Sequence, residues 1–156
     1  MSSKKSFLII CVVLVLIVLI CSCGDVIVEP KWVIGVKGAE KAVFSSLDYA
    51  KLNEVTITVE KEQQDGSILE ETWEGVYLKD VLDYLGITEY SSITFTSLDD
   101  LSIEYTPDII NDSYAILRSN VNGKGLDCED GYVQAIAGNQ PENLWVKKLS
   151  KIIVNK

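Results

Sequence analysis

The sequence contains no histidine and only one arginine, Arg118, among its 156 residues. The absence of histidine excludes nucleophilic catalysis of the Ser-His type. Acidic residues outnumber basic ones by 23 to 14, so the chain lacks the basic surface that binds a nucleic-acid backbone. The same shortage disfavours ligands that carry phosphate groups, because phosphate sites rely on Arg and Lys donors.

Cysteine is scarce outside the N-terminus. Three of the four cysteines, Cys11, Cys21 and Cys23, lie near the start, and Cys128 is alone in the rest of the chain. A lone cysteine has no internal partner, so no disulfide framework is expected. With 47% hydrophobic and 24% charged residues, the remaining chain fits one compact domain.

The N-terminus has the pattern of a secretory signal peptide. Residues 7–21 form an unbroken apolar run after Lys4 and Lys5, too short to span a bilayer comfortably. The following Ile20-Cys21-Ser22-Cys23 resembles a bacterial lipobox, in which the final cysteine receives diacylglycerol before cleavage. Lipidation is therefore predicted at Cys23. Cys21 is the competing candidate, but bulky Ile20 precedes it where the peptidase needs a small residue.

These features predict residues 1–22 as a lipoprotein signal peptide, 23–31 as a lipidated tether and 32–156 as the folded domain. The domain is expected at the extracytoplasmic face of a bacterial cell membrane, held there by acyl chains such as palmitate. An uncleaved N-terminal anchor is the alternative. Loss of the two lysines on cleavage takes the net charge from −9 to −11.

The rest of the chain alternates short strands with short helices. Three-to-four spacing of Leu78, Val81, Leu82 and Leu85 predicts a helix that Gly86 ends. Asp65-Gly66 favours a hairpin or long loop. Strands are expected over 32–36, 55–59, 93–97, 101–105, 114–118, 132–137 and 151–154, helices over 46–52, 77–85 and 108–111, and a turn over 122–125. The pattern predicts an α+β fold with a mainly antiparallel mixed sheet and short helices; an immunoglobulin-like sandwich is the alternative.

Five segments resemble the sulfite-oxidase-like molybdopterin-binding domain in order and spacing. They are WVIGVKGAEKAVFSSLDYAKL, TWEGVYLKDVLDYLGI, ITFTSLDDLSIEYTPDII, AILRSNVNGKGL and LWVKKLSKIIV, and together they reach from Trp32 to Val154. The resemblance implies the fold of that family, with molybdopterin as the family's cofactor and oxidoreductase chemistry as its activity.

The family's metal-binding residues are missing from the matching positions. In family enzymes a cysteine in a Cys-x-Gly-Asn-Arg-like loop, after the strand matching 55–59, binds molybdenum; here Glu60 to Gln64 contain no cysteine, glycine or arginine. A carboxylate is a harder ligand than a thiolate. The family's His-Gly is replaced by Asp130-Gly131, which puts an anion beside the place of an anionic cofactor. We therefore expect no cofactor, no catalytic residues and no metal.

Three interpretations stay open. The first is a non-catalytic lipoprotein that binds a small ligand or a membrane protein partner in the former cofactor cleft. The second is a molybdopterin-dependent oxidoreductase component or electron-transfer partner at the membrane, and the third is a structural lipoprotein without a ligand. The cleft candidates are Trp73, Asn122, Cys128, Asp130, Tyr132, Asn139 and Trp145.

Each candidate also has a structural interpretation. The two tryptophans suit a pocket wall, but they also suit core packing. Acidic neighbours lower the thiolate fraction of Cys128 and hence its reactivity, which favours an incidental thiol over a nucleophile or ligand. The acids at 99–100 and 127–130 lack the spacing of a calcium loop and are expected to be solvated turn residues.

Overall fold

The computed structural model describes residues 28–63 and 65–156. The predicted signal peptide, the cysteines Cys11, Cys21 and Cys23, and most of the predicted tether lie outside the described residues. No helix in the part of the chain that the structure describes is long and apolar enough to cross a membrane.

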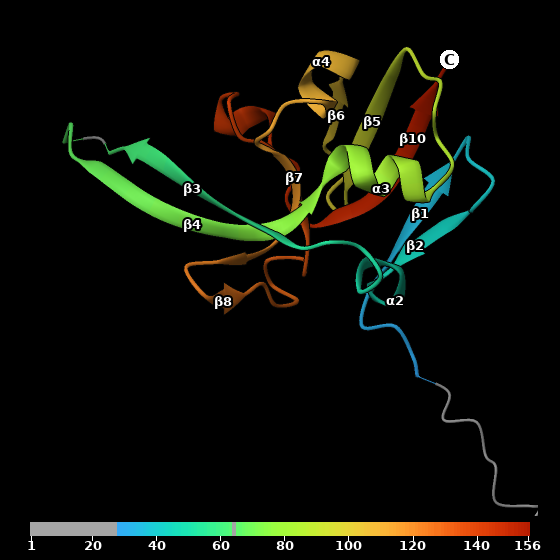
Figure 1. Ribbon diagram of the computed structural model, residues 1–156, viewed down its shortest axis with the longest axis horizontal. Coiled ribbons are helices and arrows are strands. Elements are labelled where there is room, and N and C mark those ends of the chain that lie inside the picture. The colour runs from blue at the N-terminus through green and yellow to red at the C-terminus, as the bar shows by residue number, and fades with distance from the viewer. Residues whose placement is uncertain (1–27, 64) are drawn as a thin grey trace, which may run out of the picture.

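The described residues form two five-stranded sheets (Figure 1). The first sheet has the order β2-β1-β10-β5-β6, and its only parallel pair is β1 with β10. This parallel pair departs from the antiparallel sheets of an immunoglobulin-like sandwich. The strands are β1 (Val33–Lys37), β2 (Val43–Ser45), β5 (Ser92–Ser97), β6 (Ser102–Tyr105) and β10 (Leu149–Asn155).

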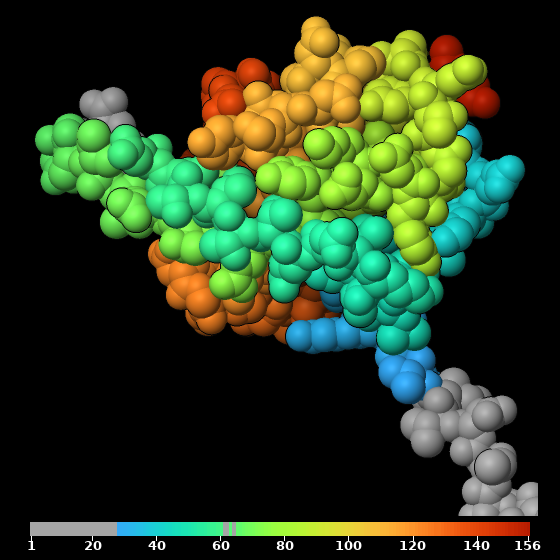
Figure 2. All heavy atoms as spheres, in the orientation of Figure 1, coloured from blue at the N-terminus to red at the C-terminus, as the bar shows by residue number. Residues whose placement is uncertain are grey.

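The second sheet is antiparallel and includes a long hairpin. It has the order β3-β4-β7-β8, and β9 pairs with β7. The β3–β4 hairpin extends as an arm beyond the body of the molecule (Figures 1 and 2). The strands are β3 (Val55–Glu62), β4 (Ile68–Tyr77), β7 (Ala115–Val121), β8 (Lys124–Gly125) and β9 (Gln134–Ala137).

Short helices connect the strands. They are α2 (Ser46–Tyr49), α3 (Leu78–Tyr84), α4 (Pro107–Ile110) and the 3-10 turn η1 (Glu142–Leu144). Helix α3 buries Leu78, Val81 and Leu82 on the core, as its apolar spacing predicts. Gly86, at φ 74°, follows the helix end in a backbone conformation that glycine adopts at little cost.

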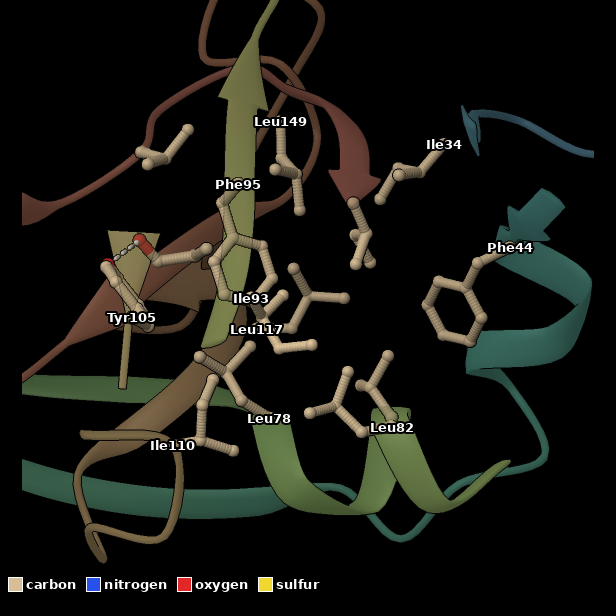
Figure 3. Packing of buried hydrophobic residues seen from close by; sticks show 14 of the residues in the cluster. Ile34, Phe44, Leu78, Leu82, Ile93, Phe95, Tyr105, Ile110, Leu117 and Leu149 are labelled. Carbon is tan, nitrogen blue, oxygen red and sulfur yellow. Dashed lines mark hydrogen bonds between the residues drawn. The ribbon is translucent and has the colours of Figure 1, made fainter. Parts of the chain in front are cut away.

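The main core lies between the first sheet, α3 and one face of the second sheet. Figure 3 shows Phe44, Phe95, Leu82 and Leu117 packed within it. Buried Tyr105 donates its hydroxyl hydrogen toward the Leu144 carbonyl at 2.6 Å and the Ala135 carbonyl at 3.2 Å. A smaller second core lies on the other face of the second sheet and consists of Trp73, Ile116, Ile136 and Trp145.

The predicted α+β class with a mainly antiparallel sheet is confirmed, but several element boundaries were wrong. The hairpin predicted around Asp65-Gly66 is confirmed, but β3 continues to Glu62 and is longer than the strand predicted over 55–59. The expected helix at 46–52 ends at Tyr49, and residues 124–125 form a two-residue strand, not the end of a turn. The strand expected from Tyr132 starts at Gln134, since Tyr132 has a φ of 61°.

Asp48 provides a test of pH-dependent stability. Its carboxylate accepts hydrogen bonds from the Tyr84 hydroxyl at 2.6 Å, the Ser45 hydroxyl at 2.7 Å, the Ser45 N–H at 3.1 Å and Lys51 Nζ at 3.2 Å. Burial alone raises the pKa of Asp48, but these hydrogen bonds outweigh it and hold the pKa well below its usual range. The charged form is thus stabilised by folding.

We expect Asp48→Asn to lower the free energy of unfolding at neutral pH by about 1–2 kcal/mol. The native carboxylate contributes its stability above the unfolded pKa, about 4, and loses it as pH falls toward the depressed native pKa. Urea denaturation of the wild type and of Asp48→Asn should therefore show a difference in the free energy of unfolding at pH 7 that becomes smaller below about pH 4. Asp65→Asn, at an exposed turn, is the control and should lower the free energy of unfolding by less than Asp48→Asn does. If the difference between wild type and Asp48→Asn stayed constant with pH, the charged form of Asp48 would not be the source of the stability.

Candidate functional site

A cavity of about 310 Å³ opens beside β7 and β9. We call it the Arg118 pocket. Its wall combines cationic, acidic, amide and apolar side chains, so it can contact both a charged group and an apolar group of one ligand. The residues lining it are Arg118, Val121, Lys124, Gly125, Leu126, Asp130, Gln134 and Lys147.

Arg118 is nearly enclosed, with 6% of its surface exposed. Its guanidinium lies 4.7 Å from the ring centroid of Trp73 and 5.5 Å from that of Trp145. Nη2 donates a hydrogen bond to Gln134 Oε1 at 2.5 Å, whereas Nε has no hydrogen-bond partner. Burial lowers the pKa of Arg118, and the charges of Glu71, Glu142 and Asp130 oppose that shift. Because a guanidinium does not deprotonate in proteins, the pocket has a permanent buried cation.

A glycine on the neighbouring strand makes room for this arrangement. Gly75 of β4 pairs with Arg118 of β7, next to an irregularity in the register between Glu74 and Gly75. A side chain at Gly75 would overlap the Leu117 carbonyl oxygen and lie 2.9 Å from the Arg118 Cα. The close approach of the two backbones requires glycine here.

The segment 127–132 positions Asp130 at the pocket wall. Asp127 Oδ1 accepts hydrogen bonds from the backbone N–H groups of Glu129 at 2.9 Å and Asp130 at 3.2 Å. Gly131, at φ 85°, packs its Cα against Lys148, so the segment lies directly on the strand-forming C-terminal part of the chain. Local hydrogen bonds and one glycine thus fix the backbone at Asp130.

A second hollow includes Gly138, where an added Cβ would lie 3.5 Å from the Trp73 ring. We call this cavity of about 350 Å³ the Asn139 pocket; it is lined by Thr58, Val59, Glu60, Tyr114, Gly138 and Asn139. Asn139 Nδ2 donates to both Asp112 carboxylate oxygens, at 3.0 and 2.9 Å. Asn139 and Asp112 also line an adjoining hollow of about 110 Å³. The Asn139 pocket therefore presents hydroxyl, amide and carboxylate groups.

The structure separates the seven residues that the sequence proposed for one cleft. Asp130 lines the Arg118 pocket and Asn139 the Asn139 pocket. Trp73 and Trp145 are buried at 1% and 6% exposure and pack edge to face, with ring centroids 5.1 Å apart. Their indole N–H groups donate to Glu71 Oε2 and the Ala137 carbonyl, so the pair forms the second core between the pockets.

The other three candidates lie on turns. Asn122, at φ 51°, accepts a hydrogen bond from the Thr72 N–H through Oδ1, which joins the turn to β4. Cys128 is exposed and lines none of the cavities given above. The Tyr132 ring lies 4.8 Å from Lys31 Nζ. Sequence reasoning missed Arg118 and Gln134 as pocket residues; the available signal was a single arginine inside an apolar strand of an acidic chain.

The two sheets, the short helices and the long hairpin define a fold of the sulfite-oxidase-like molybdopterin-binding type. The structure is similar to that of the sulfane dehydrogenase SoxCD from Paracoccus pantotrophus, with a TM-score of 0.67 and 19% sequence identity. The match covers 82% of this chain and 40% of the SoxCD chain, so this chain spans less than half the length of that chain.

The oxidoreductase molybdopterin binding domain family matches residues 29–156, and the chain belongs to this family. The resemblance of the five sequence segments is thereby confirmed. A comparison with curated proteins gives no match.

The residues at the family's metal position do not fit a molybdenum centre. Residues 60–62 are paired with β4, and the adjacent pocket offers Glu60, Thr58 and Asn139 as oxygen or amide donors. Among the described residues Cys128 is the only cysteine and is exposed elsewhere, so these residues do not supply the soft thiolate that this metal uses. Within residues 28–63 and 65–156, no three His, Cys, Asp or Glu side chains are grouped to hold a metal ion.

Proposed function

We propose that this protein is a non-catalytic, ligand-binding member of the molybdopterin-binding domain family. The observation that supports it most directly is the paired strand at residues 60–62, where a soft metal ligand would be needed. The Arg118 pocket is of the size that small-molecule sites have, and its wall includes cationic, acidic and amide side chains. A ligand other than the cofactor is the simplest use of an open pocket in a domain whose described residues contain no group of metal-binding side chains.

Metal analysis tests the non-catalytic part of the proposal. Protein purified from membranes of its native host should contain far less than one molybdenum atom per chain and no bound pterin. The measurement is elemental analysis together with fluorescence of the oxidised pterin. The matched control is a catalytic family member purified in the same way, which should be fully loaded. Stoichiometric molybdenum would contradict the proposal and favour a redox component or electron-transfer partner at the membrane.

We propose that the domain lies on the outer face of a bacterial membrane, held there by diacylglycerol on Cys23. A lipid-modified protein partitions into the membrane because each buried CH₂ contributes about 0.8 kcal/mol. Cys23→Ser should therefore move the processed domain from the membrane fraction to the soluble one, or leave an unprocessed precursor. Cys21→Ser, two residues earlier, is the control and should remain membrane-bound. Release by the Cys21 variant alone would assign the lipid to Cys21 instead.

A further inference from the structure

We infer that the Arg118 pocket binds a small organic carboxylate with a single negative charge. This inference rests on the proposed ligand-binding function and names the chemical class of the ligand. It is carried by three observations on the same cavity: a buried arginine with an unused donor, an excess of positive charge among the lining residues, and an apolar section of the wall.

The first observation is that Arg118 is buried and has a hydrogen-bond donor without a partner. The side chain is 94% enclosed, yet its Nε–H makes no hydrogen bond. A buried N–H without a partner is costly, and a carboxylate is the group that matches the planar guanidinium fork. Gln134 already holds Nη2, and the rings of Trp73 and Trp145 fix the plane of the guanidinium. The guanidinium of Arg118, which lines the cavity, is therefore held in place before any ligand arrives.

The second observation is the charge around the cavity. Arg118, Lys124 and Lys147 line the cavity with three positive charges and Asp130 with one negative charge, while Glu71 and Glu142 act on Arg118 from outside the lining. This excess is local, because the whole chain has a net charge of −9. A cationic pocket in an acidic protein attracts an anion that the remaining surface repels. Asp130 at the same wall disfavours ligands with two or more negative charges.

The third observation is the apolar part of the wall. Val121 and Leu126 also line the cavity, and their side chains are apolar, unlike the charged groups. At about 310 Å³, the cavity is at the small end of the range for organic ligand sites. An inorganic oxyanion would leave this apolar surface unused, whereas a short aliphatic or aromatic acid would cover it.

The test is calorimetric titration of the soluble domain with butyrate and benzoate. Butyramide and benzamide are matched controls, since they have nearly the same shape without the charge. Sulfate and phosphate test for inorganic oxyanions. We expect the two carboxylates to bind and the two amides to bind at least tenfold more weakly. Amides that bind as well as the acids, or inorganic ions that bind as well as the acids, would overturn the inference.

Variants locate the binding at this pocket. Arg118→Lys keeps a cation but removes the fork, and should weaken butyrate binding roughly tenfold. Since Arg118 is buried and this variant is at risk of misfolding, the exposed pair Lys124→Gln with Lys147→Gln provides a second measurement, with an expected loss of roughly three- to tenfold. Lys151→Gln, on an exposed position of β10, is the control and should leave affinity unchanged. Equal affinity in all variants would place the ligand elsewhere.

The outcomes separate this inference from the proposed function. If no carboxylate binds while an uncharged compound does, the ligand class is wrong and the ligand-binding role stands. If the native protein carries molybdenum, the proposed function fails whatever the titration shows.

Discussion

Replacing Gly131 with alanine is expected to lower the free energy of unfolding by about 3 kcal/mol or more. Two costs combine. A non-glycine residue at φ 85° is strained by roughly 1–2 kcal/mol. The new Cβ would also overlap the Lys148 Cα and lie 2.7 Å from the Lys148 Cβ, and such overpacking costs about 1–3 kcal/mol. Urea denaturation followed by tryptophan fluorescence measures the loss.

Gly123→Ala is the matched control for this prediction. Gly123 has a similar φ of 75°, but an added Cβ would meet no atom within 4 Å. Only the backbone cost of about 1 kcal/mol is expected there. Equal losses in the two variants would show that close packing on Lys148 contributes nothing. Since Gly131 adjoins Asp130, the Gly131 variant should also alter ligand binding at the Arg118 pocket, and the Gly123 variant should alter it less.

The strands and helices of this fold follow largely from local sequence. Helix α3 and the hairpin around Asp65-Gly66 are specified by apolar spacing and by turn residues that act within a few positions. Strand β2, by contrast, has three residues and forms only because β1 lies beside it. The length of β3 is likewise set by its partner, since Glu60 and Glu62 have weak strand preference and pair with β4 across the arm. Tertiary pairing therefore extends elements beyond their local signals.

The site was predicted less well, for a physical reason. Family resemblance identified the positions around Asp130 and Asn139, and both line pockets. It could not show that Trp73 and Trp145 pack against each other, because that contact joins residues 72 positions apart in sequence. The role of Arg118 also depends on long-range contacts: Gln134, Trp73 and Trp145 come from three other segments. A net charge of −9 gave no indication that three cations share one cavity.

Trp73→Ala is the second prediction with a large expected effect, a loss of about 3–5 kcal/mol in the free energy of unfolding. Trp73 is 1% exposed, and its ring packs on Trp145, while its N–H donates to Glu71 at 2.9 Å. Removing it leaves a cavity in the second core that the surrounding strands cannot easily close. It also removes the ring nearest the Arg118 guanidinium, so a folded fraction of this variant should lose affinity for butyrate. Thermal unfolding and urea denaturation measure the loss in the free energy of unfolding.

Two comparison variants separate burial from the loss of an aromatic ring. Trp73→Phe retains an aromatic ring over Arg118 but removes the N–H, so its cost should be clearly smaller than that of the alanine variant. Trp32→Ala removes a half-buried tryptophan whose ring contacts Phe44 and Tyr49 beside the first sheet. It should lower the free energy of unfolding by less than Trp73→Ala does, because less buried apolar surface is lost. Unlike Trp73→Ala, it should leave butyrate affinity unchanged, since Trp32 does not line the Arg118 pocket. If Trp73→Ala were no more destabilising than Trp32→Ala, the second core would have little part in holding the sheet and the buried arginine together.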